Sequence, residues 1–256
     1  MAGFRIGEAA IWPAVALAIL VTTCSAQATT ITGDAAATCG GLAEPTQQGV
    51  RIDSATLQAP APLAVSERGP TPAARISPAS PAFCKLLGHI DPADPKAPPI
   101  RFEVNLPVEW NDRSLQYGGG GFNGVLITGL GLPPAHPYDK PSPLAQGFVT
   151  YGTDSGHESK PGEPPQLFAL NDEAFENFSH LAYKKVRDAA LALMIRTYGK
   201  PPAKMYFMGS SEGGREGADH GPALSGGFRR HLRARACHQL GRVAACRHAL
   251  RFGDHG

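Results

Sequence analysis

The chain has 256 residues, a formal net charge of +2 at pH 7, and 42% apolar against 18% charged residues. These values are typical of a globular protein with one sizeable core, and they exclude a largely disordered chain. No apolar run beyond the N-terminus is long enough to span a bilayer, so we expect the mature protein to have no membrane partner.

Residues 1–28 have the features of a secretory signal peptide. Arg5 supplies a positive charge, and Ala9–Val21 is an apolar run of 13 residues, which is too short to span a bilayer comfortably. Ala26-Gln27-Ala28 fits a cleavage site of small residues. The alternative is a weakly apolar N-terminal helix. With the signal, the protein is expected to be secreted or periplasmic.

Residues 29–99 are predicted to form an N-terminal segment rich in proline. Positions 60–99 hold ten of the 24 prolines, which favours irregular, extended chain over helix. Five cysteines in an exported chain permit disulfides. Cys24 leaves with the signal, and the last two cysteines lie in an atypical tail, so Cys39 and Cys84 are the natural pair. Their bridge would fix the ends of what could otherwise be a disordered linker.

A glycine loop follows the first predicted strands. Ile100–Leu106 alternates apolar and polar residues, as a half-buried strand does, and Leu115–Tyr117 is a second, short strand. Gly118–Gly121 then let the backbone approach a ligand closely. A phosphate site is disfavoured, because no Lys-Ser/Thr follows and the glycine spacing fits no dinucleotide fingerprint. A donor of an oxyanion hole fits better, with a flexible turn as the alternative.

The next strand, predicted over 147–154, ends in an acid and a histidine. Asp154 and His157 are three residues apart, which suggests two members of a catalytic triad. On the α/β-hydrolase fold, however, the chain order is serine, acid, histidine. Both residues precede the candidate serine described below, so we interpret them as loop and pocket-wall residues.

A long amphipathic helix is predicted over 174–198. It begins after Asn171-Asp172-Glu173 and ends at Gly199-Lys200-Pro201-Pro202. Its predicted apolar face repeats at helical spacing, with Phe175, Phe178, Ala182, Val186, Ala189, Leu193 and Ile195.

The motif Gly209-Ser210-Ser211-Glu212-Gly213 follows four apolar residues, 205–208, that indicate a short buried strand. Gly-x-Ser-x-Gly is the sequence form of a nucleophile elbow, in which a serine is held exposed on a strand-to-helix turn. The motif alone is weak, because glycine and serine are common in turns. Here strand, helix, strand and elbow follow in order, which favours a parallel α/β sheet.

Several motifs in this order resemble the tannase/feruloyl esterase family, which includes mono(hydroxyethyl) terephthalate hydrolases. They are Phe83-Cys84, Asn105–Asn111, the Gly118–Gly124 loop, Thr150–His157 and Gly209–Gly217. The resemblance covers about residues 39–217. It implies that residues 100–217 are the N-terminal part of an α/β-hydrolase core, truncated after the elbow, where the family inserts a large lid.

The family implies an exported serine esterase that cleaves esters of aromatic acids such as gallate and ferulate. By position, Ser211 would be the nucleophile, and the backbone N–H groups of Gly121 and Glu212 would form the oxyanion hole. Cys39 and Cys84 match a family disulfide. Members often hold calcium in the lid, but the lid is absent here, so we expect no metal or other cofactor.

Two departures from the family matter. Many members carry a cysteine directly before the nucleophile, bridged to a cysteine beside the catalytic histidine, whereas this chain has Ser210. The family's catalytic Asp and His lie far downstream of the elbow, beyond the lid, whereas this chain ends at Gly256.

The segment 218–256 has a different character from the rest of the chain. It contains seven arginines, five histidines and two acids, without clear periodicity. We interpret it as an out-of-frame or truncated read; the alternatives are an unstructured basic tail or a nucleic-acid-binding arm, for which an exported protein has little use. No spacing selects a base or an acid, so no triad Asp or His is assigned. Two functions stay open: an esterase acting on a small aromatic ester, and an inert truncated fragment of one.

Overall fold

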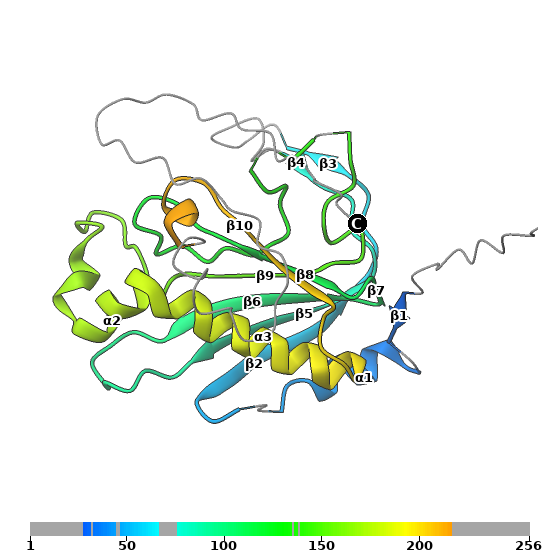
Figure 1. The fold of residues 1–256 in the computed structure, drawn as a ribbon, viewed down its shortest axis with the longest axis horizontal. Helices are drawn as coiled ribbons and strands as arrows, with labels where there is room; N and C mark the ends of the chain where they lie inside the picture. Colours follow the sequence, from blue (N-terminus) through cyan, green and yellow to red (C-terminus); the bar gives the residue numbers. More distant parts are fainter. Residues whose placement is uncertain are drawn as a thin grey trace, which may run out of the picture.

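A six-stranded mixed sheet forms the centre of the computed structural model (Figure 1). The structure describes residues 28–31, 33–44, 47–66, 76–134, 136–137 and 139–216, so nearly all of the predicted signal peptide and the whole basic tail lie outside the described residues. The strand order is β10-β8-β9-β6-β5-β2. The six strands are β2 (Val50–Gln58), β5 (Phe83–Ile90), β6 (Ile100–Pro107), β8 (Arg113–Tyr117), β9 (Val149–Thr153) and β10 (Lys204–Met208).

The sheet has an antiparallel half and a parallel half. β2, β5, β6 and β9 pair antiparallel in succession, whereas β9, β8 and β10 run parallel to one another. The carboxyl ends of β8, β9 and β10 therefore lie along one edge, which is where open α/β sheets place ligand sites. The parallel α/β arrangement predicted from the sequence is confirmed in this half.

A helical layer covers one face of the sheet, and α3 runs across that face in Figure 1. It continues directly from two shorter helical pieces, and a 3-10 turn lies before them. In chain order these are η2 (Leu167–Leu170), α2 (Asp172–Glu176), the π-helical turn η3 (Asn177–Leu181) and α3 (Ala182–Tyr198). The helix is capped as predicted: the Asn171 side chain accepts from the Ala174 N–H, and Gly199 ends α3 with a left-handed backbone.

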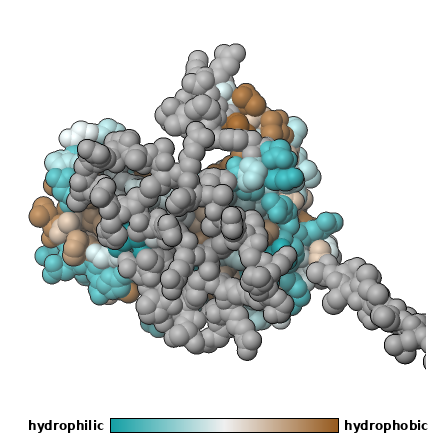
Figure 2. Space-filling view, turned by 45° about the horizontal axis from the view of Figure 1, so that its top comes forward, coloured by the Kyte–Doolittle hydropathy of each residue, from teal (hydrophilic) through white to brown (hydrophobic). Residues whose placement is uncertain are grey.

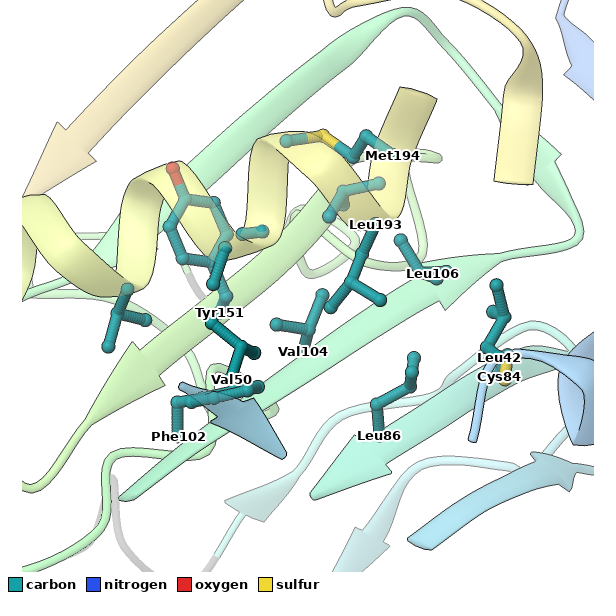
Figure 3. Close-up of a cluster of buried hydrophobic side chains, with 14 of the residues drawn as sticks. Leu42, Val50, Cys84, Leu86, Phe102, Val104, Leu106, Tyr151, Leu193 and Met194 are labelled. Atoms are coloured by element: carbon teal, nitrogen blue, oxygen red, sulfur yellow. The ribbon is translucent and has the colours of Figure 1, made fainter. Parts of the chain in front are cut away.

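The main core lies between α3 and the sheet, as Figure 3 shows. Alternate residues of β6 point into it and are fully buried, namely Phe102, Val104 and Leu106. They pack with Leu193 and Met194 of α3 (Figure 3). Two members of the predicted apolar face do not take part: Phe175 is 53% exposed and Ile195 is 43% exposed. The π turn between α2 and α3 inserts an extra residue into the helical repeat. Phe175, which lies before this turn, therefore does not face the same side as the apolar residues of α3.

The opposite face of the sheet is covered by the loop after β8. The Asn105 amide on β6 donates to the Thr128 carbonyl at 2.7 Å. A Cβ at Gly152 would lie 2.3 Å from the Ile127 carbonyl oxygen, so only glycine lets this loop lie against β9. β6 is therefore buried on both faces, including Glu103, and is not the half-buried strand that its alternating sequence predicts.

The N-terminal segment is joined to the sheet rather than separate from it. Cys39 of α1 (Ala35–Gly41) forms a disulfide with Cys84 of β5, with the two Cα atoms 5.6 Å apart. The predicted disulfide is thus present. β2 and β5 precede residue 99, so the sheet extends across the boundary suggested by the sequence. Short strand pairs complete the segment: β1 (Thr29–Thr30) with β7 (Glu109–Trp110), and β3 (Ala64–Val65) with β4 (Ile76–Ser77).

On the face drawn in Figure 2, hydrophilic and apolar side chains are mixed where described residues are visible. Leu63 and Val65, at the start of the β3–β4 pair, are 58% and 69% exposed. Within the described residues, no helix is both long and apolar enough to cross a membrane.

Candidate active site at the carboxyl ends of β8 and β10

The glycine loop and the elbow leave the sheet side by side. Tyr117, the last residue of β8, is paired with Met208, the last residue of β10. The Gly118 N–H then donates to the Met208 carbonyl at 2.8 Å. The parallel register therefore brings together two motifs that are about 90 residues apart in the sequence.

Ser211 occupies the turn between β10 and a following helical turn over 212–216. Its side chain is exposed, and its backbone is left-handed, with a φ of +57°. For a residue with a Cβ this conformation costs about 1–3 kcal/mol and persists only where the surroundings hold it. The helical turn does so, because the Gly214 N–H donates to the Ser211 carbonyl at 3.0 Å. This is the strained, exposed serine geometry of a nucleophile elbow.

The two glycines of the elbow are required by close backbone packing. A Cβ at Gly209 would lie 2.6 Å from the Gly213 carbonyl carbon. A Cβ at Gly213 would lie 2.7 Å from the carbonyl oxygen of Gly119. The first residues of the helical turn therefore lie directly against the glycine loop.

The tip of the glycine loop faces open space. No described atom lies within 4 Å of a Cβ built at Gly120 or Gly121. Gly121 has a φ of +61°, and the loop closes where the Asn123 N–H donates to the Gly120 carbonyl at 2.9 Å. The loop is thus packed at Gly118 and Gly119 and open at Gly121.

A buried polar network lies beneath the loop. The Glu216 carboxyl group, 2% exposed, accepts a hydrogen bond of 2.5 Å from the Asn123 amide. The Tyr183 hydroxyl on α3 accepts from the Gly119 N–H at 3.0 Å and lies 3.3 Å from the same amide nitrogen. Burial raises the pKa of Glu216 to about 7, although hydrogen bonds from Asn123 and Tyr183 oppose the shift.

Arg215 fastens the elbow to the helical layer. Its guanidinium pairs with Glu212 in the same turn and donates to the Ser179 carbonyl at 2.6 Å. It also lies over the Phe178 ring, 5.4 Å from the centroid. The carbonyls of the π turn therefore hold Arg215, which lies two residues after Gly213.

Asp154 and His157 do not form a catalytic pair. The buried Asp154 carboxylate accepts from the backbone N–H groups of Arg101 and Gly156 and from the Arg101 side chain, at 2.9–3.1 Å. The buried His157 ring stacks on Phe168 with centroids 3.8 Å apart, and burial lowers its pKa. Neither His157 nitrogen bonds to Asp154 or Ser211. Asp154 is a loop-ordering residue, in agreement with the interpretation of its sequence position.

No group of three or more His, Cys, Asp and Glu side chains in the described ranges is arranged to hold a metal ion. The described residues at this edge of the sheet supply an exposed serine, backbone N–H groups and a buried carboxyl group.

A family model described as tannase and feruloyl esterase matches residues 84–220, which is more than half of the chain. The matched region contains the glycine loop, β9, α3 and the elbow. The chain belongs to the tannase and feruloyl esterase family.

Curated relatives in this family are much longer than the chain. An uncharacterised esterase of Agrobacterium fabrum is 42% identical over 189 residues, covering 72% of this chain and 32% of that protein. A mono(2-hydroxyethyl) terephthalate hydrolase of Piscinibacter sakaiensis is 34% identical, covering 59% and 26%. The chain thus spans between about a quarter and a third of these relatives.

Solved structures show the same fold. An esterase of Aspergillus oryzae matches with a TM-score of 0.55 and 23% identity, and feruloyl esterase B of the same organism with 0.53 and 24%. Each match covers 72% of this chain and 34% of the other. The α/β-hydrolase fold class is therefore confirmed, with about a third of the neighbours' length present.

The sequence singled out Ser211, Glu212 and Gly121 as candidates but did not indicate the buried network beneath them. Glu216 follows Arg215 at the end of the motif, where a charged residue in a helix is normally solvated. Asn123 lies two residues after Gly121 and offered a hint, because asparagine tolerates a left-handed backbone; its φ is +53°.

Proposed function

We propose that the chain carries the nucleophile and oxyanion hole of a serine esterase. The observation that carries the proposal is Ser211 itself, an exposed serine with a left-handed backbone on a strand-to-helix turn beside an open glycine loop. A serine in this position can reach a carbonyl carbon without moving the backbone.

The backbone N–H groups of Glu212 and Gly121 would stabilise the oxyanion. Glu212 directly follows the nucleophile, and Gly121 lies at the open tip of the adjacent loop. Such preorganised donors act on the negative charge that develops on the carbonyl oxygen during acyl transfer. Removing one of them typically lowers kcat about 10²–10³-fold.

The reaction has two acyl transfers. The Ser211 Oγ attacks the ester carbonyl carbon while a base takes its proton, and the tetrahedral intermediate collapses with loss of the alcohol. Water then cleaves the acyl-enzyme and releases the acid. Among the described residues no histidine bonds to Ser211. The proposal therefore assigns the general base and its acid to residues outside the described ranges.

The substrate class is an ester of an aromatic acid. The relatives include a mono(2-hydroxyethyl) terephthalate hydrolase and a probable feruloyl esterase, and terephthalic and ferulic acids are both aromatic acids. The signal-like residues 1–28 support action outside the cytoplasm, in the periplasm or after secretion.

A second function is supported by the chain's length relative to its family. Because it spans about a third of its relatives, the chain by itself could be an inert part of such an esterase, with a nucleophile that no base activates. The two functions make opposite predictions for covalent labelling of Ser211.

A fluorophosphonate probe distinguishes the two functions. Labelling of the chain that Ser211→Ala abolishes would support the esterase. Ser210→Ala is the matched control, because Ser210 is the adjacent exposed serine and should leave labelling intact. Absence of label on folded wild-type protein would support the inert fragment, and label that persists in Ser211→Ala would assign the nucleophile elsewhere.

A further inference from the structure

We infer that Glu216, acting through Asn123 and Tyr183, is a positioning residue that sets the distance between the two halves of the oxyanion hole. This inference rests on the proposed function, and it assigns a role to the one buried acid at the site that the acyl-transfer chemistry does not use. Glu216 touches no reacting atom; it acts on the loop that carries Gly121.

Glu216 is fixed to the elbow. It lies in the same helical turn as Glu212 and five residues after Ser211. Arg215, its neighbour, is bonded to the π turn at the Ser179 and Phe178 carbonyls. The carboxyl group of Glu216 is therefore held in a fixed position relative to Ser211. A hydrogen bond from another segment to this carboxyl group fixes the position of that segment relative to Ser211 as well.

The glycine loop is held on both sides of its open tip. On one side, the Gly119 N–H donates to the Tyr183 hydroxyl. On the other, the Asn123 amide donates to Glu216. Gly120 and Gly121 lie between these two anchors and have no described neighbour at their Cβ positions. The direction of the Gly121 N–H is thus determined by the two anchors.

A carboxyl group suits this position better than an apolar side chain of the same size. Oε2 lies only 3.2 Å from the Cβ position of Gly118, so the group fills the space between the elbow and the loop. A carboxylate accepts hydrogen bonds from several donors at once, and Asn123 and Tyr183 both supply donors. An apolar residue would leave the Asn123 amide buried without its acceptor.

The test measures kcat and KM for an aryl ester with the full-length gene product. Glu216→Ala is expected to lower kcat about 10–100-fold with little change in KM, because a misplaced donor is lost mainly in the transition state. Glu216→Gln keeps an acceptor for Asn123 and should recover most of the loss. Tyr183→Phe removes the bond to Gly119 and should also lower kcat.

Two matched controls separate positioning from general destabilisation. Tyr198 is another buried tyrosine of α3, and its hydroxyl donates to the Pro107 carbonyl at 2.8 Å, far from the elbow. Glu103 is another buried acid of the sheet, paired with Lys85 at 3.4 Å. Tyr198→Phe and Glu103→Ala should reduce stability while leaving kcat unchanged. Equal losses of kcat in the controls and the site variants would overturn the inference.

Amide hydrogen exchange keeps the inference testable without turnover. Glu216→Ala is expected to speed exchange of the 119–123 amides at least tenfold while the β8 and β10 amides stay protected. If the wild-type protein lacks Ser211-dependent turnover, the proposed function fails, and the exchange result still decides whether Glu216 holds the loop. Unchanged loop protection in Glu216→Ala would overturn the inference on its own.

Discussion

At the scale of single residues, Gly213 is the closest point between elbow and loop. Gly213→Ala would bring a Cβ to 2.7 Å from the Gly119 carbonyl oxygen and 3.1 Å from the Gly118 carbonyl carbon, both of them backbone atoms. Neither can move without disturbing the loop, so we expect a loss of about 1–3 kcal/mol in the free energy of unfolding.

Urea unfolding would measure this loss. Gly131→Ala is the control, because no described atom lies within 4 Å of its Cβ position and its backbone is not left-handed. The control should be neutral or slightly stabilising. A neutral Gly213→Ala would mean that loop and elbow are farther apart than the structure shows.

The raised pKa of Glu216 makes a prediction about stability and pH. Its folded-state pKa is about 7, against 4.5 for an unperturbed glutamate, so the folded protein binds the proton more tightly than the unfolded chain. The resulting stabilisation is fully present below about pH 4.5 and is lost as pH rises through about 7. The difference is on the order of 3 kcal/mol.

Glu216→Gln should therefore flatten the stability curve between pH 5 and pH 7.5 in urea unfolding. The comparison with wild type isolates Glu216, because burial also raises the pKa of Asp154 and Glu103 in both proteins. The titratable groups that act on Glu216 are Tyr183 of α3 and Glu212 of its own turn, and the hydrogen bond from Asn123 also lowers its pKa. If the free energy of unfolding changed with pH in the same way in wild type and Glu216→Gln, the raised pKa of Glu216 would be contradicted.

At the scale of the elements, the disulfide joins α1 to β5 across 45 residues. Replacing both cysteines, Cys39→Ala with Cys84→Ala, should lower the free energy of unfolding by about 4 kcal/mol through the loop-closure entropy of the unfolded chain. Guanidinium unfolding measures it, and reduction of the wild-type protein should give a similar loss. A loss below about 1 kcal/mol would show that β2, β5 and β6 hold α1 in place without the bridge.

The sequence predicted a strand correctly where the residues of that strand form a clear local pattern. The short segment Leu115–Tyr117 predicted β8, the apolar residues 205–208 predicted β10, and alternation predicted β6. β2 was missed because its residues, Val50–Gln58, mix polar and apolar types at an edge of the sheet. The exposure of Phe175 was missed because the π turn changes the helical phase, and nothing local in the sequence marks that turn.

The residues of the candidate site likewise fall into two groups, those that the local sequence suggests and those that depend on tertiary packing. Ser211 and Gly121 could be proposed from the sequence because the glycines near them indicate tight turns. The network around Glu216 could not, because its burial depends on α3 and the glycine loop meeting over it. Tertiary packing decides which charged residue of a short helix faces inward.

At the scale of the whole molecule, β10 has a described partner only on its β8 side. An unpaired strand edge is prone to association. We therefore expect the 256-residue chain, expressed by itself, to be poorly soluble and to show little or no esterase activity. Size-exclusion chromatography and an aryl-ester assay test this. A monodisperse monomer with turnover that Ser211→Ala abolishes would contradict it.

The position of β8 in the sheet also fixes the order in which the site can be built during synthesis. Both neighbours of β8, β9 and β10, come later in the chain, whereas β2, β5 and β6 lie side by side in the sheet in the order in which they occur along the chain. A nascent chain ending before residue 204 has no elbow, and its Gly118 N–H has no Met208 carbonyl to bind. The glycine loop therefore gains this anchor only once residues 204–208 have joined the sheet, so the site forms after the antiparallel half.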